Sequence, residues 1–246
     1  MKNILLEICF DGTSYHGWQK QNNARTIQGT LEEAYHKLTG MQIQTTGCSR
    51  TDAGVHAHQF FANFRSESQI PVERICRALN TVLSKDIRVL KSLEVKEDFN
   101  SRFSAKDKTY VYLINTAKIE NPFFSRFAYF NAMDINVQNM QKAADEFIGT
   151  HEFDAFVATG GSHHTTERTI KELTVKETEY ENIIRIEITA DAYLYNMVRI
   201  IAGTLLHVGI GKKCAMEIPD IIKSKNRIHA GATLPAHGLH LMKVRY

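Results

Sequence analysis

The sequence predicts an α+β fold made of two ferredoxin-like halves, each with the element order βαββαβ, whose antiparallel sheets pack around a central active-site cleft. Two observations lead to this expectation. The same alternation of strand and helix patterns occurs twice along the chain, and no Gly/Ser linker or low-complexity segment separates the two occurrences. At 246 residues the chain is also long enough to bury a substantial core.

The first half begins with an alternating apolar segment at residues 4–10, ILLEICF, which is typical of a strand. An amphipathic helix follows and is expected to stop at Gly40. Its apolar face consists of Ile27, Leu31, Ala34 and Leu38. This strand and this helix are the first two elements of the first βαββαβ unit.

Two strands, a helix and a last strand complete the first half. The strands are expected at 41–46 and 55–64, and the second should place alternate residues on one side. Those residues are His56, His58, Phe60, Ala62 and Phe64. Pro71 then opens a helix whose apolar register is Ile75, Leu79 and Val82, and residues 87–95 form the closing strand.

The second half repeats this order with longer pieces. A strand at 108–117 precedes a helix at 135–149 that Asp134 is expected to cap. A hairpin turns at Glu181 and Asn182, and an apolar helix follows. The remaining elements are expected at Tyr193–Val208 for that helix, at Pro219–Lys223 for a short helix and at 238–246 for the last strand.

The boundary between the halves is expected between Phe99 and Lys106. The predicted domains are therefore 1–103, which carries the motif GCSRTDAGVHA, and 104–246, which carries the strand KTYVY and the apolar helix. Because no flexible linker joins them, the halves should pack together, and clefts between domains are common ligand sites.

Composition narrows the class of protein. The composition, with 43% apolar and 23% charged residues, is typical of an ordinary globular protein. No apolar run is long enough for a membrane span. The start MKNILLEICF lacks the pattern of a secretory signal, so a cytoplasmic protein is expected. Its four cysteines form no CxxC pair and should be reduced thiols. A net charge of +3 permits an anionic partner without requiring one.

Three stretches contain candidate functional residues. GCSRTDAGVHA places Asp52 and Arg50 on a glycine-flanked loop, although such an aspartate can also serve only to cap its own turn. In KTYVY, Tyr110 and Tyr112 share a strand face, and either packing or stacking on a nucleobase would suit them. Arg199 is the one charge of the apolar helix, so it must reach solvent or meet a carboxylate, for which Asp52 is a candidate.

Four segments, in this order, resemble the TruA family of tRNA pseudouridine synthases: GCSRTDAGVHA, KTYVY, LYNMVRIIAGTLLHVG and AHGLHLMKVRY. The resemblance runs over essentially the whole chain. It implies a homodimeric isomerase that converts uridine to pseudouridine in the anticodon stem-loop of tRNA, around positions 38, 39 and 40. It implies no metal, no small-molecule cofactor and no membrane partner.

The resemblance also assigns roles to individual residues. Asp52 matches the catalytic aspartate, and Tyr110 matches the tyrosine that stacks on the target uracil. Arg199 matches the arginine that pairs with the aspartate, and Arg50 matches a basic residue implicated in displacing the base. An opposite charge nearby would help Asp52 to remain ionised in a dry pocket, and base flipping would give the enzyme access to a uridine inside a stem.

Some residues depart from the family pattern. Asn100 stands where a histidine is usual, and Val157, His163 and His164 change a loop at 157–166 that could contact RNA. A related synthase with another RNA target therefore stays an alternative. A second alternative is a non-catalytic RNA-binding protein on the same scaffold.

Other site chemistries are also open. His56 and His58 could offer two metal ligands from one strand face, with His151, His163 or His164 completing the set. Cys48 could act as a thiol nucleophile, but no base is evident beside it. A hydrolase that uses Asp52 would call for a second carboxylate or a metal cluster, and the sequence shows neither near Asp52.

Overall fold

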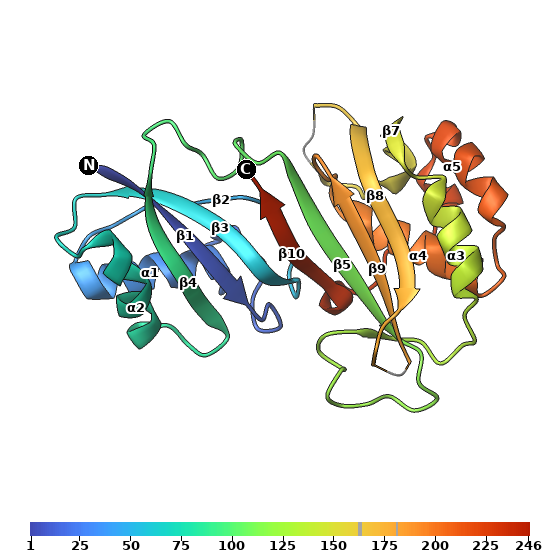
Figure 1. Ribbon diagram of the computed structural model, residues 1–246, viewed down its shortest axis with the longest axis horizontal. Helices are drawn as coiled ribbons and strands as arrows, with labels where there is room; N and C mark the ends of the chain where they lie inside the picture. Colours follow the sequence, from blue (N-terminus) through green and yellow to red (C-terminus); the bar gives the residue numbers. More distant parts are fainter. Residues whose placement is uncertain (162–163, 181) are drawn as a thin grey trace. The chain divides into compact units, whose positions relative to one another are not determined.

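The computed structural model describes residues 1–161, 164–180 and 182–246. Its chain forms two compact units. Unit 1 consists of Met1–Lys106 and Leu241–Tyr246, so it contains both termini, and unit 2 consists of Asp107–His240. Both units combine helices with mostly antiparallel strands, so the fold is mixed α and β (Figure 1).

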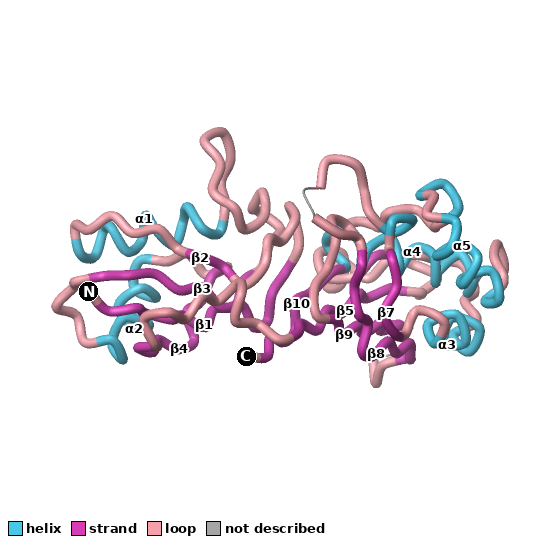
Figure 2. The backbone as a smooth tube through the Cα atoms, turned by 90° about the horizontal axis from the view of Figure 1, so that it is seen from above, coloured by secondary structure: helices cyan, strands magenta, loops and turns pink. Residues whose placement is uncertain are grey.

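Unit 1 is built on the central strand β1, which is antiparallel to β3 on one side and to β4 on the other. Strand β2 pairs with β3, and helices α1 and α2 pack against each other. Figure 2 shows α1 running along one face of these strands. The elements are β1 (Lys2–Phe10), α1 (Ile27–Thr39), β2 (Thr46–Gly47), β3 (His56–Ser66), α2 (Val72–Val82), β4 (Ile87–Val95) and the end of β10 (Leu239–Arg245).

Helix α1 confirms the prediction for this segment. The Thr26 hydroxyl accepts a hydrogen bond from the Gly29 amide at 3.2 Å, which caps the first turn. Gly40 ends the helix with a φ of 71°, a left-handed conformation that glycine adopts without steric cost. Of the predicted apolar face, Leu38 is only half-buried, while the other three residues are buried.

Two strand predictions in unit 1 need correction. The strand expected at 41–46 shrinks to the two residues of β2. In β3, His58 is exposed, whereas His56, Phe60 and Phe64 are buried. The reason is a register shift between β1 and β3, where Ile8 pairs with Phe60 but Phe10 pairs with Ala57, so the simple alternation breaks.

Helix α2 differs from its prediction in its buried face. It begins after Pro71, as expected, but Val82 is 40% exposed. Val72, Ile75 and Leu79 are the buried positions instead. Because Val72 lies three residues before Ile75, the apolar stripe runs one turn nearer the start of the helix.

Unit 2 contains an antiparallel set of strands in the order β5-β9-β8-β7, with β6 parallel to β5. Helix α3 packs on β8 and α4, and α5 packs on β7, as the grouping of these helices in Figure 1 shows. The elements are β5 (Asp107–Asn115), β6 (Tyr129–Phe130), α3 (Val137–Asp145), β7 (Gly149–Glu152), β8 (Glu167–Glu177), β9 (Ile183–Ala190), α4 (Met197–Gly209) and α5 (Ile218–Ser224).

Local backbone geometry corrects two boundaries in unit 2. The cap of α3 is Asn136, whose side chain accepts from the Asn139 amide at 2.8 Å, and not Asp134. Helix α4 begins at Met197 and not at Tyr193, because Asn196 has a left-handed φ of 61°. The predicted hairpin is present as β8 and β9, and Asn182 in its turn has a φ of 63°, but Glu181 lies outside the described residues.

Helix α4 is the most deeply buried helix of unit 2. Except for Arg199 and His207, which are half-buried, its residues are buried. A Cβ at Gly203 would lie 1.9 Å from the carbonyl oxygen of Ala232, so the helix and the segment after α5 are in direct backbone contact. Within the described parts of the chain, neither this helix nor any other has the length and apolar character that a membrane crossing requires.

Candidate functional site in two parts

The Asp52 loop, defined as residues 48–55, connects β2 to β3 in unit 1. Its turn is closed by Gly54, with a φ of 80°, and by a hydrogen bond from the Val55 amide to the Asp52 carbonyl at 3.2 Å. Asp52 is half-buried and Arg50 is exposed. The structure thus places these two predicted residues on one short loop.

The Asp52 loop is held by the segment that follows β1. The Trp18 amide donates to the Thr51 carbonyl at 3.2 Å, and the Gly54 amide donates to the Tyr15 carbonyl at 3.2 Å. A Cβ at Gly17 would lie 2.2 Å from the Thr51 carbonyl oxygen. The backbone beside Asp52 is therefore fixed by close packing, which only glycine permits at position 17.

Gly12 and Trp18 secure the two ends of the Asp52 loop. A Cβ at Gly12 would lie 2.0 Å from the Val55 carbonyl oxygen, and one at Gly47 would lie 2.4 Å from the Trp18 ring. The Trp18 ring stacks on Phe60 with centroids 4.4 Å apart. These supporting residues were missed in the sequence, although the glycines of the segment DGTSYHGWQ are the signal that could have revealed them.

His56 belongs to this support and not to a histidine pair with His58. Its Nδ1 accepts from the Gly12 amide at 3.1 Å and lies 3.2 Å from the Asp11 carboxylate, while the residue is buried. His58 is exposed, so the two imidazoles do not share the strand face on which the metal hypothesis depended. His163, a further candidate ligand, lies outside the described residues.

Tyr110, in unit 2, occupies the middle of β5. It is 5% exposed, and its ring meets that of Tyr193 edge to face, with centroids 5.0 Å apart. The Tyr193 hydroxyl donates to the carbonyl oxygens of Lys108 and Ile188 at 2.8 and 2.9 Å. Burial raises the pKa of Tyr193 well above its ordinary value, so this hydroxyl stays protonated and holds the ring against Tyr110.

Arg199 lies in the first turn of α4, half-buried. Its Nε donates to the Leu234 carbonyl at 2.7 Å, and one terminal nitrogen donates to the Asn196 side-chain oxygen at 2.6 Å. The backbone of Asn196 is left-handed, with a φ of 61°. Asn196 and Leu234 therefore help to orient Arg199, and no pattern in the sequence pointed to either.

Tyr112 adds a second buried phenol to this part of unit 2. Its hydroxyl donates to the Pro235 carbonyl at 2.8 Å. Burial raises the pKa of Tyr112 far above its usual range, while the positive charge of Arg199 opposes that shift. The segment at 234–235 thus accepts hydrogen bonds from both Arg199 and Tyr112.

The four predicted residues divide between the units: Asp52 and Arg50 belong to unit 1, and Tyr110 and Arg199 belong to unit 2. The structure brings the first two together on one loop. It places the other two on β5 and α4, which contact each other. The pairing of Arg199 with Asp52 stays a prediction.

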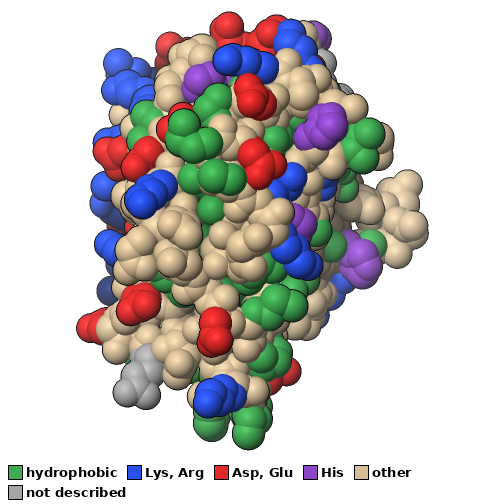
Figure 3. Space-filling view, turned by 90° about the vertical axis from the view of Figure 1, so that its right-hand side faces the viewer, with side chains coloured by type: hydrophobic (Ala, Val, Ile, Leu, Met, Phe, Trp, Pro, Cys, Tyr) green, Lys and Arg blue, Asp and Glu red, His purple; other side chains and the backbone are tan. Residues whose placement is uncertain are grey.

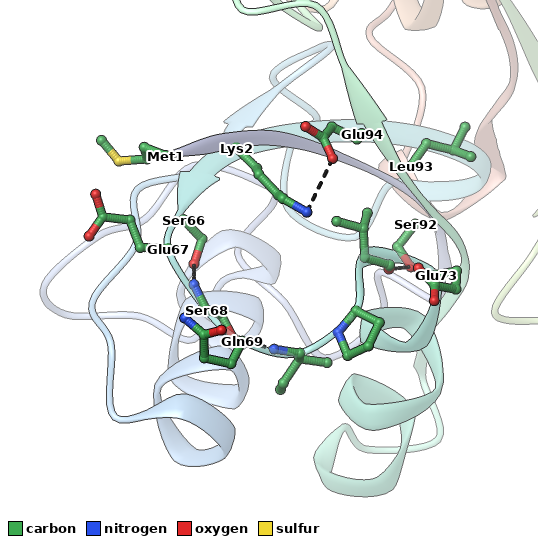
Figure 4. Close-up of a pocket in the computed structure, with 13 residues that line it drawn as sticks. Met1, Lys2, Ser66, Glu67, Ser68, Gln69, Glu73, Ser92, Leu93 and Glu94 are labelled. Atoms are coloured by element: carbon green, nitrogen blue, oxygen red, sulfur yellow. Dashed lines mark hydrogen bonds and ion pairs between the residues drawn. The ribbon is translucent and has the colours of Figure 1, made fainter.

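Unit 1 also contains an open pocket of about 750 Å³ (Figure 4). It lies between the start of β1, the loop from β3 to α2, and β4, and the ion pair of Lys2 with Glu94 at 3.4 Å spans its rim. Among its lining residues, three glutamates outnumber the single lysine, a charge balance that does not suit a polyanionic ligand. Asp52 and Arg50 lie outside this lining.

Comparison with known proteins gives the family. The model of a family described as tRNA pseudouridine synthase matches residues 8–104 and 143–246. The chain is 47% identical to tRNA pseudouridine synthase A of Acetivibrio thermocellus, and 46% identical to the proteins of that name from Thermoanaerobacter pseudethanolicus and Clostridium botulinum. Each match spans 246 residues and 100% of both chains. The chain belongs to the TruA family of tRNA pseudouridine synthases.

Among solved structures, the archaeal box H/ACA sRNP Nop10-Cbf5 complex is similar at a TM-score of 0.37 and 10% identity. That match covers 82% of this chain and 44% of the other.

Proposed function

We propose that Asp52 is the nucleophile with which this enzyme isomerises uridine to pseudouridine in tRNA, at positions around 38, 39 and 40 of the anticodon stem-loop. Family membership gives the reaction and the RNA class. The observation that supports Asp52 is its loop, where close backbone packing at Gly12 and Gly17 fixes the chain and leaves the carboxylate half-buried. A nucleophile needs such a fixed position to benefit from proximity.

The proposed reaction rearranges one nucleotide without a cofactor. The Asp52 carboxylate attacks the sugar or base of a flipped uridine, and the bond between C1′ and N1 breaks. The uracil then turns and a bond between C1′ and C5 forms. The bond between the Asp52 carboxylate and the nucleotide breaks, which restores the free carboxylate, while the C5 proton leaves and N1 takes up a proton. Because no atom is gained or lost overall, no oxidant, reductant or second substrate is required.

We assign supporting roles to the other three residues. Arg199 supplies the positive charge that favours an ionised carboxylate. The hydrogen bonds from its guanidinium group to Leu234 and Asn196 support this role because they restrict the orientation of that group. Arg50, exposed beside Asp52, helps to displace the base. Tyr110 stacks on the uracil, and since it is 5% exposed, side chains that cover its ring must move when the base enters.

The proposal also covers the arrangement of the two halves and the position of the active site. We propose two ferredoxin-like halves, one carrying the Asp52 loop and the other carrying Tyr110 and Arg199, with the active site in a cleft between them. The strand order β4-β1-β3-β2 in unit 1, with its two helices, supports this description for the first half. We further propose that the enzyme works in the cytoplasm as a homodimer.

The face of unit 2 that carries α3 and α5 is a poor candidate for the RNA surface. Acidic and basic side chains are interspersed over it, as Figure 3 shows. RNA binding relies on basic groups that neutralise successive phosphates. We therefore place tRNA on another face.

Mapping pseudouridine in tRNA tests the proposed positions. Purified enzyme is incubated with unmodified tRNA transcripts, and pseudouridine is located by sequencing after chemical derivatisation. We expect new pseudouridine around positions 38 to 40, and none in a transcript whose uridines there are replaced by cytidine. Modification elsewhere in the tRNA would leave the reaction in place but overturn the anticodon stem-loop as its target.

The role of Asn196 gives a separate prediction. Asn196→Gly keeps the left-handed backbone without strain but removes the amide that binds Arg199. A hydrogen bond to a charged group contributes about 1.5 to 3 kcal/mol, and because this bond orients Arg199 we expect its loss to lower kcat about tenfold or more. Thermal stability should change little, because glycine also relieves the left-handed strain at position 196, which costs about 1 to 2 kcal/mol.

Asn196→Asp is the matched variant, because it keeps an acceptor for Arg199 and should retain more activity than Asn196→Gly. Steady-state kinetics on both variants separate the two roles. Equal kcat for wild type and Asn196→Gly would show that Arg199 needs no such support.

A further inference from the structure

Arg102 and Phe103 form an unusual surface feature of unit 1, which we call the Arg102–Phe103 platform. The Phe103 side chain is 77% exposed, and the Arg102 guanidinium carbon lies 5.4 Å from the centre of its ring. A large aromatic ring held in water gains nothing for folding. A planar ring beside a cation is, however, the combination that proteins use to bind unpaired nucleotides.

The turn that presents the platform is well ordered by hydrogen bonds. The Asn100 side-chain oxygen accepts from the amides of Arg102 and Phe103 at 2.9 and 3.2 Å. The Ser104 amide donates to the Asn100 carbonyl at 2.9 Å, and the Asn100 amide donates to the Ser104 hydroxyl at 3.2 Å. Asn100, the departure from the family pattern, is therefore the residue that closes this turn.

The turn is anchored to the core through Ser101, which is fully buried. The Ser101 amide and hydroxyl both donate to the Asn63 side-chain oxygen at 2.9 Å, and the Tyr246 hydroxyl donates to the Ser101 carbonyl at 2.9 Å. The Ser101 hydroxyl also lies in hydrogen-bond contact with the Thr46 carbonyl. Thr46 opens β2, the strand that leads directly into the Asp52 loop.

We propose that the Arg102–Phe103 platform binds an unpaired base of the tRNA, with Phe103 stacking on the base and Arg102 contacting the adjacent phosphate. The nucleotide is not the target uridine, for which Tyr110 is assigned. Because the platform and the Asp52 loop share β2 as support, a base held at Phe103 fixes the RNA relative to Asp52. This inference rests on the proposed function in one respect, which is that the enzyme binds tRNA. It does not depend on the role of Asp52.

Phe123, a second strongly exposed phenylalanine, lacks this construction. Phe123 is 85% exposed on the loop between β5 and β6. Its amide donates to the Asn121 side chain at 3.0 Å, but residues 121–127 around it are exposed or half-buried, so this turn contains no buried residue comparable to Ser101. Phe123 therefore serves as the control for a loss of exposed aromatic surface.

The test measures binding of an anticodon stem-loop RNA to the full chain carrying Asp52→Asn, so that the RNA stays unmodified. We expect Phe103→Ala to raise Kd about 5- to 150-fold, the fold-change that corresponds to one stacked base. Phe103→Trp should bind within about twofold of the parent, whereas Phe103→Leu should resemble Phe103→Ala because it keeps apolar surface but cannot stack. Phe123→Ala should leave Kd unchanged.

The role of Arg102 is read from the salt dependence of Kd. Arg102→Ala should lower the slope of log Kd against log salt by about 0.7, as the loss of one phosphate contact on a single strand requires. Arg77→Ala, which removes an exposed cation from α2, should leave the slope unchanged. An unchanged slope for Arg102→Ala would remove Arg102 from the phosphate contact.

Two outcomes would contradict the proposal that the Arg102–Phe103 platform binds a base of the tRNA. One is parental affinity in Phe103→Leu or Phe103→Ala, and the other is a change of sedimentation coefficient in Phe103→Ala, which would make Phe103 a contact between copies of the chain. Neither outcome bears on the nucleophile, because binding is measured without turnover. Conversely, turnover retained in Asp52→Asn would show that Asp52 is not the nucleophile, but it would not affect the proposal that the platform binds a base.

Discussion

Asp52→Asn is expected to bind tRNA with nearly the affinity of the wild type and to form no detectable pseudouridine. The amide has almost the shape of the carboxylate, so the Asp52 loop, held at Gly12, Gly17 and Trp18, should keep its backbone. The asparagine amide, however, has no negative charge and is a poor nucleophile. Removal of a nucleophile that acts covalently typically lowers kcat by about 10⁴-fold or more.

Release of tritium from C5 of labelled uridine in tRNA measures this turnover, and a filter-binding titration measures affinity. Asp98→Asn, at an exposed carboxylate of the same unit, is the control and should be as active as the wild type. A kcat for Asp52→Asn within tenfold of the wild type would remove Asp52 from the chemistry. A matching loss of tRNA affinity would make it a binding residue.

Gly17→Ala should disrupt both stability and turnover. Gly17 has a φ of 78°, which costs a residue with a Cβ about 1 to 2 kcal/mol. In addition, the new Cβ would lie 2.2 Å from the Thr51 carbonyl oxygen, a separation that real structures do not tolerate. The Asp52 loop must therefore shift, and a displacement of about 1 Å at a catalytic group can lower the rate about 100-fold.

Gly40→Ala separates these two causes. Gly40 has nearly the same φ, 71°, but a Cβ there would meet nothing within 4 Å. We expect Gly40→Ala to lower the free energy of unfolding by the backbone cost and to leave kcat unchanged. Denaturant unfolding and tritium release on both variants give the comparison, and equal kcat in the two would show that close packing at Gly17 does not position Asp52.

The sequence predicted most elements of the fold because local signals were strong. Helix α1 carries its own start and stop signals in Thr26 and Gly40, and the hydrophobic pattern located its core face. The exposure of His58 was not predictable, since it depends on how β3 pairs with β1 across the register shift. The start of α4 was missed because nothing local in the sequence announces the left-handed backbone of Asn196.

In the candidate site, too, the sequence predicted what depends on neighbouring residues and missed what depends on packing between distant segments. Asp52 and Arg50 lie within one contiguous motif, so the sequence shows that they are neighbours. The support for Asp52 comes from Gly12 and Gly17, some 40 residues away, and only the packed structure shows why these positions exclude a Cβ. Likewise, the Leu234 carbonyl that binds Arg199 belongs to a segment 35 residues further along the chain.

A crystal structure of the Asp52→Asn protein bound to tRNA tests the central claim most directly. We predict that a uridine of the anticodon stem-loop lies outside its base stack, with C1′ or C6 about 3 to 3.5 Å from the side chain of residue 52. The Arg199 guanidinium group should contact the same side chain. A target uridine still stacked in the stem, or one whose sugar and base both lie beyond reach of residue 52, would contradict the account.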